Sequence, residues 1–113
     1  MKIYIAGKIS GDPLYKARFE AAAETVKKEY YDKNPVILNP AILPEGLEEI
    51  DYMQITMAML NAADLVVFLP NSPTSEGAMI EWSWCKKTGK PYKYLTTAFY
   101  FCNHCNIMTE KEQ

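Results

Sequence analysis

Four short apolar runs alternate with three longer segments of helical periodicity, and this alternation restricts the possible folds more than any other feature of the chain. The runs, taken as strands, cover residues 2–7, 35–40, 64–70 and 91–96. The run DLVVFLP at 64–70 is almost continuously apolar, which is typical of a strand covered on both faces of its sheet. The alternation predicts a parallel sheet with right-handed crossovers. We therefore expect a single doubly wound α/β domain, Rossmann- or flavodoxin-like, with helices on both faces of the sheet.

Signals for helix ends accompany the helical segments. Asp12 followed by Pro13 predicts the start of the first helix, since aspartate can cap a helix and proline suits its first position. Asp51 is expected to cap the second helix, and the third is expected to run to about Lys87, with Gly89 at its C-terminus. The faces expected to point inward carry Tyr15, Phe19, Ala22, Val26 and Tyr30 in the first helix, and Tyr52, Ile55, Met59 and Ala63 in the second.

The composition fits one globular domain. Of 113 residues, 49% are hydrophobic, which is enough apolar content to form a core without disulfides or metal. Residues 1–96 are taken as the domain and residues 97–113 as a partly apolar tail. A net charge of -2 without a block of like charges predicts no nucleic acid polymer as partner. Because no segment resembles a signal peptide or a membrane span, we expect a cytoplasmic protein without a membrane partner.

The tail bears on assembly and on metal binding. Its run TTAFYF at 96–101 is too apolar for a free end, which predicts a homodimer or a larger homo-oligomer. Cys102, His104 and Cys105 are too crowded for a zinc finger and lack a second ligand pair, so no metal is expected. Together with Cys85 the chain has three cysteines, and this odd number does not fit a secreted disulfide framework.

Two polar loops are expected at the same edge of the sheet. GKISG at 7–11 follows the first strand, and PNSPTSEG at 70–77 follows the third. Ligands of parallel sheets bind beyond the carboxyl ends of the strands, so these loops should converge on one crevice. Neither contains the G-x-G-x-x-G of a dinucleotide site or the G-x-x-x-x-G-K-[ST] of a phosphate loop. The single histidine, His104, lies in the tail, which gives a Ser-His or Cys-His nucleophile little support.

Glu81 stands in the middle of the third expected helix among small or apolar neighbours. The residues one turn away are Gly77, Ala78, Trp84 and Cys85. Such a carboxylate is either solvated or desolvated in a cleft, and the spacing alone leaves both interpretations open. With Ser75 or Thr74 as the cap, the N–H groups of Gly77 and Ala78 have no helical partner and can bind a hydroxyl, a phosphate or a carboxylate. A polar ligand held there would lie beside Glu81.

Four segments of the chain resemble the nucleoside 2-deoxyribosyltransferase-like superfamily, and most closely a small, often phage-borne group within it. They are KIYIAGKISGDP, LNPAILPEG, DYMQITMAMLNAADLVVFLP and SEGAMIEWSWCKKTGKP. The resemblance covers roughly residues 2–95. Its most specific part is the S-x-G-x-x-x-E spacing of Ser75, Gly77 and Glu81, followed by Gly-Lys-Pro at 89–91.

The resemblance implies catalytic roles for two residues. Glu81 corresponds to the nucleophile that attacks the anomeric carbon of a deoxyribosyl group, and Tyr4 corresponds to a tyrosine that orients this nucleophile. The nucleobase then leaves and a covalent glycosyl-enzyme ester forms, as in retaining glycosidases. Water completes a hydrolysis, and a second base completes a transfer.

Five further residues are expected to bind the substrate. Gly7 and Lys8 correspond to the first sugar- or phosphate-binding loop of the superfamily. Ser75 and Gly77 correspond to phosphate contacts in the branch that hydrolyses deoxynucleoside monophosphates, whereas the transferase branch tends to carry an aspartate in place of Ser75. Ala78 joins them through its backbone N–H.

The chain departs from its relatives at two positions. Many of them carry an aspartate that contacts sugar or base where this chain has Thr56, and often a glycine where it has Ser83. The expected function is that of an N-glycosidase or deoxyribosyltransferase acting on a small (deoxy)nucleoside or nucleoside monophosphate, without a cofactor. The alternative, favoured by Thr56, is a non-catalytic nucleotide-binding or sensing protein that keeps the same pocket.

Overall fold

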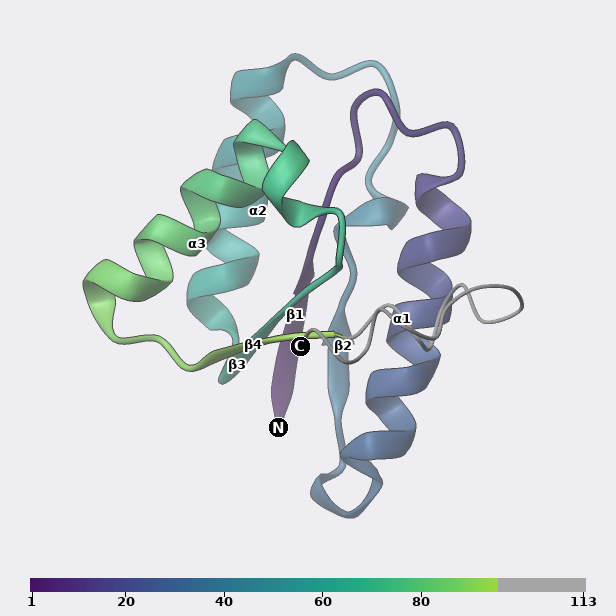
Figure 1. Ribbon diagram of the computed structural model, residues 1–113, viewed down its shortest axis with the longest axis vertical. Helices are drawn as coiled ribbons and strands as arrows, with labels where there is room; N and C mark the ends of the chain where they lie inside the picture. The colour runs from purple at the N-terminus through teal and green to yellow at the C-terminus, as the bar shows by residue number, and fades with distance from the viewer. Residues whose placement is uncertain (96–113) are drawn as a thin grey trace.

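Residues 1–95, the part of the chain that the computed structural model describes, are built on one parallel sheet (Figure 1). Its strands are β1 (Lys2–Ala6), β2 (Val36–Leu38), β3 (Leu65–Phe68) and β4 (Tyr92–Tyr94), in the order β2-β1-β3-β4. In this sheet Tyr4 pairs with Leu38 on one side and with Val66 on the other. The α/β fold with a parallel sheet is thus confirmed. The domain limit at residue 96 and every prediction placed on the tail lie outside the described residues.

Helices cover both faces of the sheet (Figure 1). They are α1 (Tyr15–Glu29) on one face and α2 (Glu49–Ala62) and α3 (Glu76–Thr88) on the other, with the short 3-10 turns η1 (Tyr31–Lys33), η2 (Pro40–Ile42) and η3 (Ser72–Thr74) between elements. Side chains alternate along β1, so Ile3 and Ile5 enter the core beneath α1, whereas Tyr4 and Ala6 enter the core beneath α2 and α3. This alternation turns Tyr4 toward the helix that carries Glu81.

The first helix begins later than predicted. α1 starts at Tyr15 and not directly after Asp12, because Asp12 caps the turn that precedes the helix. Its carboxylate accepts hydrogen bonds from the N–H of Leu14 at 3.0 Å and from Nε of Arg18 at 2.9 Å. The inward face is largely as expected, with Phe19, Ala22 and Val26 buried.

The second helix begins earlier than predicted, and one residue of its expected inward face is exposed. Glu48 is the N-cap, and Asp51 accepts a hydrogen bond from the N–H of Glu48 at 3.1 Å in a capping box. The prediction for Ile55 is wrong, since this residue is 37% exposed. Its neighbour Thr56 is buried instead, on the same face as Leu60. This burial places Thr56 in the wall of the cleft described below.

The predicted ends of the third helix are confirmed. Ser75 is the N-cap of α3, and its Oγ accepts a hydrogen bond from the N–H of Ala78 at 3.2 Å. Gly89 ends the helix with a φ of 78°, in the left-handed region that favours glycine. These ends fix the position of α3 along the edge of the sheet, and with it the position of Glu81.

Candidate functional site

A cleft of about 860 Å³ opens at the carboxyl ends of β1 and β3, where the two polar loops were expected to converge. Both loops contribute to its wall, with Gly7 and Ser10 from the first and Thr74 to Gly77 from the second, and Ala78 of α3 lies next to them. α2 closes another side with Tyr52, Met53 and Thr56. Tyr4 and Glu81 also line the cleft. The convergence of the loops is therefore as predicted.

Tyr4 and Glu81 are joined by a hydrogen bond within the core. The Tyr4 hydroxyl donates to Oε2 of Glu81 at 2.8 Å, across 77 positions of the chain. Tyr4 is 1% exposed and Glu81 is 4% exposed. A buried carboxylate without a partner would be strongly destabilising, and the tyrosine provides that partner. The sequence left open whether Glu81 is solvated or desolvated in a cleft. In the structure it is desolvated and lines the cleft.

Opposing effects act on the ionisation of Glu81. Burial raises the pKa of Glu81 to about 7, while the hydrogen bond from Tyr4 acts in the lowering direction. The Tyr4 hydroxyl has a pKa raised well above its ordinary value, first by burial and then by the charge of Glu81. At neutral pH Glu81 therefore exists in comparable amounts as carboxylate and as acid, with Tyr4 protonated.

Thr56 is a residue of the cleft whose burial the sequence did not reveal. It was noted only as a replacement for an aspartate, but it lines the cleft together with Tyr4 and Glu81, and its hydroxyl donates to the carbonyl of Met53 at 3.4 Å. Thr56 is 6% exposed. The available signal was a polar residue on an otherwise apolar helix face, which in a buried setting needs a polar partner.

Gly7 and Gly77, the two glycines of the predicted site, differ in whether a larger side chain would fit in their place. A Cβ on Gly7 would lie 2.7 Å from Cδ1 of Leu69, so this position needs glycine for packing of the loop. A Cβ on Gly77 would lie 3.4 Å from Sδ of Met53, which is an ordinary van der Waals contact. Both glycines line the cleft, but close packing against Leu69 is enough to explain why residue 7 is a glycine.

Lys8 does not line the cleft. Its Nζ donates to the carbonyl of Thr74 at 3.3 Å, and its backbone N–H donates to Oδ1 of Asn71 at 3.2 Å. The side chain faces a separate hollow of about 350 Å³ beside the cleft, which Asp12 also lines. Lys8 thus ties the two loops together, and the other predicted site residues form the cleft without it.

The family model for a domain of unknown function, DUF4406, matches residues 1–94. The chain belongs to this family. No curated protein matches the chain. The match spans the whole sheet and the cleft, so the Tyr4–Glu81 pair lies inside the DUF4406 domain.

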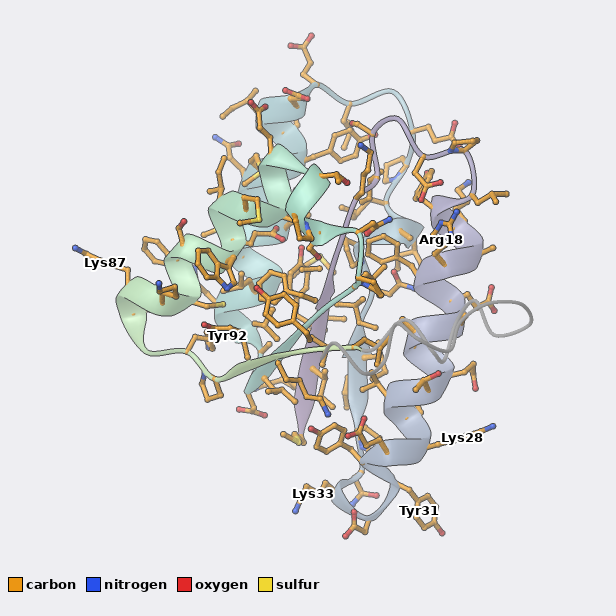
Figure 2. All side chains as sticks on the ribbon, in the orientation of Figure 1. Arg18, Lys28, Tyr31, Lys33, Lys87 and Tyr92 are labelled. Carbon is orange, nitrogen blue, oxygen red and sulfur yellow. The ribbon has the colours of Figure 1, made fainter. Side chains whose placement is uncertain are left out.

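Carboxylates dominate the charge of the DUF4406 cleft. Besides Glu81, its lining includes Glu45, Glu49 and Glu76, while none of its described lining residues is Lys, Arg or His. Lys16 lies just outside and pairs with Glu45 at 3.0 Å. Other cations project away from the body of the protein, as Figure 2 shows for the labelled side chains Lys28, Lys33 and Lys87. The cleft is therefore negative in character.

Two further predictions concern metals and membranes. Residues 1–95 contain no group of three or more His, Cys, Asp or Glu side chains placed to hold a metal ion. Cys102, His104 and Cys105 are not among the described residues. Within that same part of the chain, no helix has the length and apolar character needed to cross a membrane.

Proposed function

We propose that this protein is an N-glycosidase or deoxyribosyltransferase of the nucleoside 2-deoxyribosyltransferase-like type, acting on a small (deoxy)nucleoside or nucleoside monophosphate. One observation carries the proposal. A buried glutamate, Glu81, lines a cleft at the carboxyl edge of a parallel sheet and accepts a hydrogen bond of 2.8 Å from a buried tyrosine. A desolvated but partnered carboxylate is suited to nucleophilic attack on an electron-poor carbon.

The chemistry follows that of retaining glycosidases. An oxygen of Glu81 attacks the anomeric carbon, and the bond from this carbon to the base nitrogen breaks. The electron pair of that bond leaves with the base, which takes up a proton, and a glycosyl ester remains on Glu81. Water attacks the ester in hydrolysis, or a second base does so in transfer, and the carboxylate is regenerated. Tyr4 holds Oε2 throughout and so limits the rotation of the carboxylate.

The test incubates the protein with a panel of deoxynucleosides and their monophosphates and measures the free base released by chromatography. Glu81→Gln keeps the shape of the side chain and removes the nucleophile, so we expect base release to fall by several orders of magnitude, with little change in affinity. Glu20→Gln, an exposed glutamate of α1 outside the cleft, is the matched control and should behave like the parent. Equal rates for Glu81→Gln and the parent contradict the assignment of the nucleophile.

The alternative function is nucleotide binding or sensing without catalysis. The observation that favours it is Thr56, which lies buried in the wall of the cleft where many relatives carry an aspartate, and which cannot carry a proton or a charge as an aspartate does. If parent and Glu81→Gln both bind a nucleoside or nucleotide but neither releases base, this alternative replaces the enzyme. Homo-oligomer formation and a cytoplasmic location stay predictions.

A further inference from the structure

The chain between β2 and α2 crosses the carboxyl edge of the sheet as an arch. In Figure 1 it runs from the side of α1 to the first turn of α2, beyond the carboxyl ends of the strands. Its middle, residues 43–47, is called the strap from here on. All residues of the strap except Pro44 line the cleft. The strap therefore forms one wall of the cleft that Glu81 also lines.

The strap has open space on its other side as well. Leu43, Pro44 and Glu45 also line a groove of about 910 Å³ beside α1. Residues 44–47 are exposed, and a Cβ added to Gly46 would meet nothing within 4 Å. Gly46 has a φ of 99°, a conformation that glycine adopts without strain. A thin, exposed wall between two hollows is the kind of segment that opens locally while the core stays folded.

Both ends of the strap are anchored. On one side Ala41 is buried beneath α1, and its N–H donates to Oδ1 of Asn39 at 2.9 Å. On the other side the capping box of Glu48 and Asp51 fixes the start of α2. The residues between these anchors can therefore move while the sheet and the helices stay in place.

The side chain of Tyr52, on α2, holds the strap against the helix. Its hydroxyl donates to the carbonyl of Pro44 at 2.6 Å and accepts a hydrogen bond from the N–H of Leu47 at 3.3 Å. A tyrosine hydroxyl can both donate and accept, so a single oxygen joins two points of the strap to α2. The ion pair of Glu45 with Lys16 of α1, at 3.0 Å, is a second tie. Both of its side chains are largely exposed, and such pairs contribute little.

We propose that the strap is a gate that opens to admit ligand to the cleft, and that Tyr52 is the positioning residue that holds this gate closed. The identity of the ligand, a small nucleoside, rests on the proposed function. The opening of the strap does not, because it can be measured without a ligand.

The first experiment measures the opening of the strap by NMR relaxation dispersion of its backbone amides, in the absence of ligand. Tyr52→Phe keeps the ring in the cleft wall and removes only the hydroxyl. We expect it to raise the population of the open strap about tenfold, because both hydrogen bonds to the strap are lost. Tyr31→Phe is the matched control. Tyr31 is 80% exposed and follows the C-terminal end of α1 (Figure 2), so this variant should behave like the parent.

The second experiment measures the kinetics of binding of 2′-deoxyadenosine and thymidine by NMR line-shape analysis. A gate limits entry and exit alike, so Tyr52→Phe should raise the association and dissociation rates together, each by up to about tenfold, with a much smaller change in Kd. Loss of a contact between Tyr52 and the nucleoside would instead raise the dissociation rate alone. The association rate therefore distinguishes a gate from a binding contact.

Two outcomes overturn the proposal: an open population that is equal in the parent and Tyr52→Phe, or an association rate that does not rise although the strap opens more often. If Tyr52→Phe does not fold, Glu45→Gln weakens the second tie and should raise the open population about twofold. If neither nucleoside binds the parent but the open population rises as expected, the strap opens as proposed and the proposed function loses its support. If base is released and the open population does not change, the reverse holds.

Discussion

Glu81 is more easily accommodated in the core as an acid than as a carboxylate, and this has a consequence for folding. Its pKa is about 7 in the folded protein, against an ordinary value of 4.5. Burial is the main cause, and the hydrogen bond from Tyr4 offsets it only in part. The folded state therefore binds this proton more tightly than the unfolded state does.

The predicted result is a loss of stability as pH rises. Below pH 4.5 the group is protonated in both states and its contribution is fully present. Between pH 4.5 and about 7 only the unfolded state releases the proton, so stability falls, and above pH 7 it levels off. The pKa difference corresponds to about 3 kcal/mol in the free energy of unfolding. Urea unfolding of the parent and Glu81→Gln from pH 4.5 to pH 8 isolates this contribution as the difference between the two curves. Parallel curves would show that Glu81 is not the source.

At the scale of elements, α3 presents the site because its first turn is anchored. The Ser75 side chain caps the helix through Ala78, and η3 precedes it directly. Both residues were expected to bind substrate, and capping gives Ser75 a structural task as well. A displaced first turn would move the N–H groups of the cleft wall.

Ser75→Ala is expected to lower the free energy of unfolding by about 1 kcal/mol, because the N–H of Ala78 loses its partner. Ser75→Asp should retain most of that stability, since aspartate is an equally good N-cap. Chemical unfolding of the three proteins measures the effect. Ser75→Asp falling as low as Ser75→Ala would count against the capping role.

For the whole molecule, the charge of the cleft bears on the choice between nucleoside and nucleotide. The sequence resemblance at Ser75 pointed toward a monophosphate. In the structure, Glu49 and Glu76 stand around the opening together with Glu45, which is paired with Lys16, and Lys8 lies outside the lining. Coulomb's law in water gives roughly 0.5 kcal/mol for two unit charges about 8 Å apart, so several such pairs act together against a dianion.

We therefore predict that a deoxynucleoside binds about tenfold more tightly than its 5′-monophosphate at low salt. Glu76→Gln should reduce this difference in affinity, because it removes one carboxylate. Salt at 1 M should reduce it as well, because it screens the charges. Isothermal titration calorimetry on the full chain measures both affinities. Equal or tighter binding of the monophosphate would contradict the prediction and return support to the phosphate contacts expected at Ser75 and Gly77.

Local features of the fold were predictable from the sequence. Strand positions, the Ser75 cap and the Gly89 terminus depend on the residues within one or two turns, and such patterns are written in the chain itself. The starts of α1 and α2 were misplaced because Asp12 and Asp51 bond to neighbouring backbone groups in ways that shift a cap by a few residues.

The candidate site was predictable only in part. The resemblance to a known superfamily named Tyr4 and Glu81, but spacing alone could not tell whether Glu81 is solvated or buried. Tertiary structure decided this: the register of β1 and β3 and the packing of α2 and α3 bring Tyr4, Thr56 and Glu81 together from three separate elements. The same packing left Lys8 outside the cleft. The ionisation of Glu81 is also decided by the tertiary structure, because the pKa of a carboxylate depends on the water and the hydrogen-bond donors that the folded chain leaves around it.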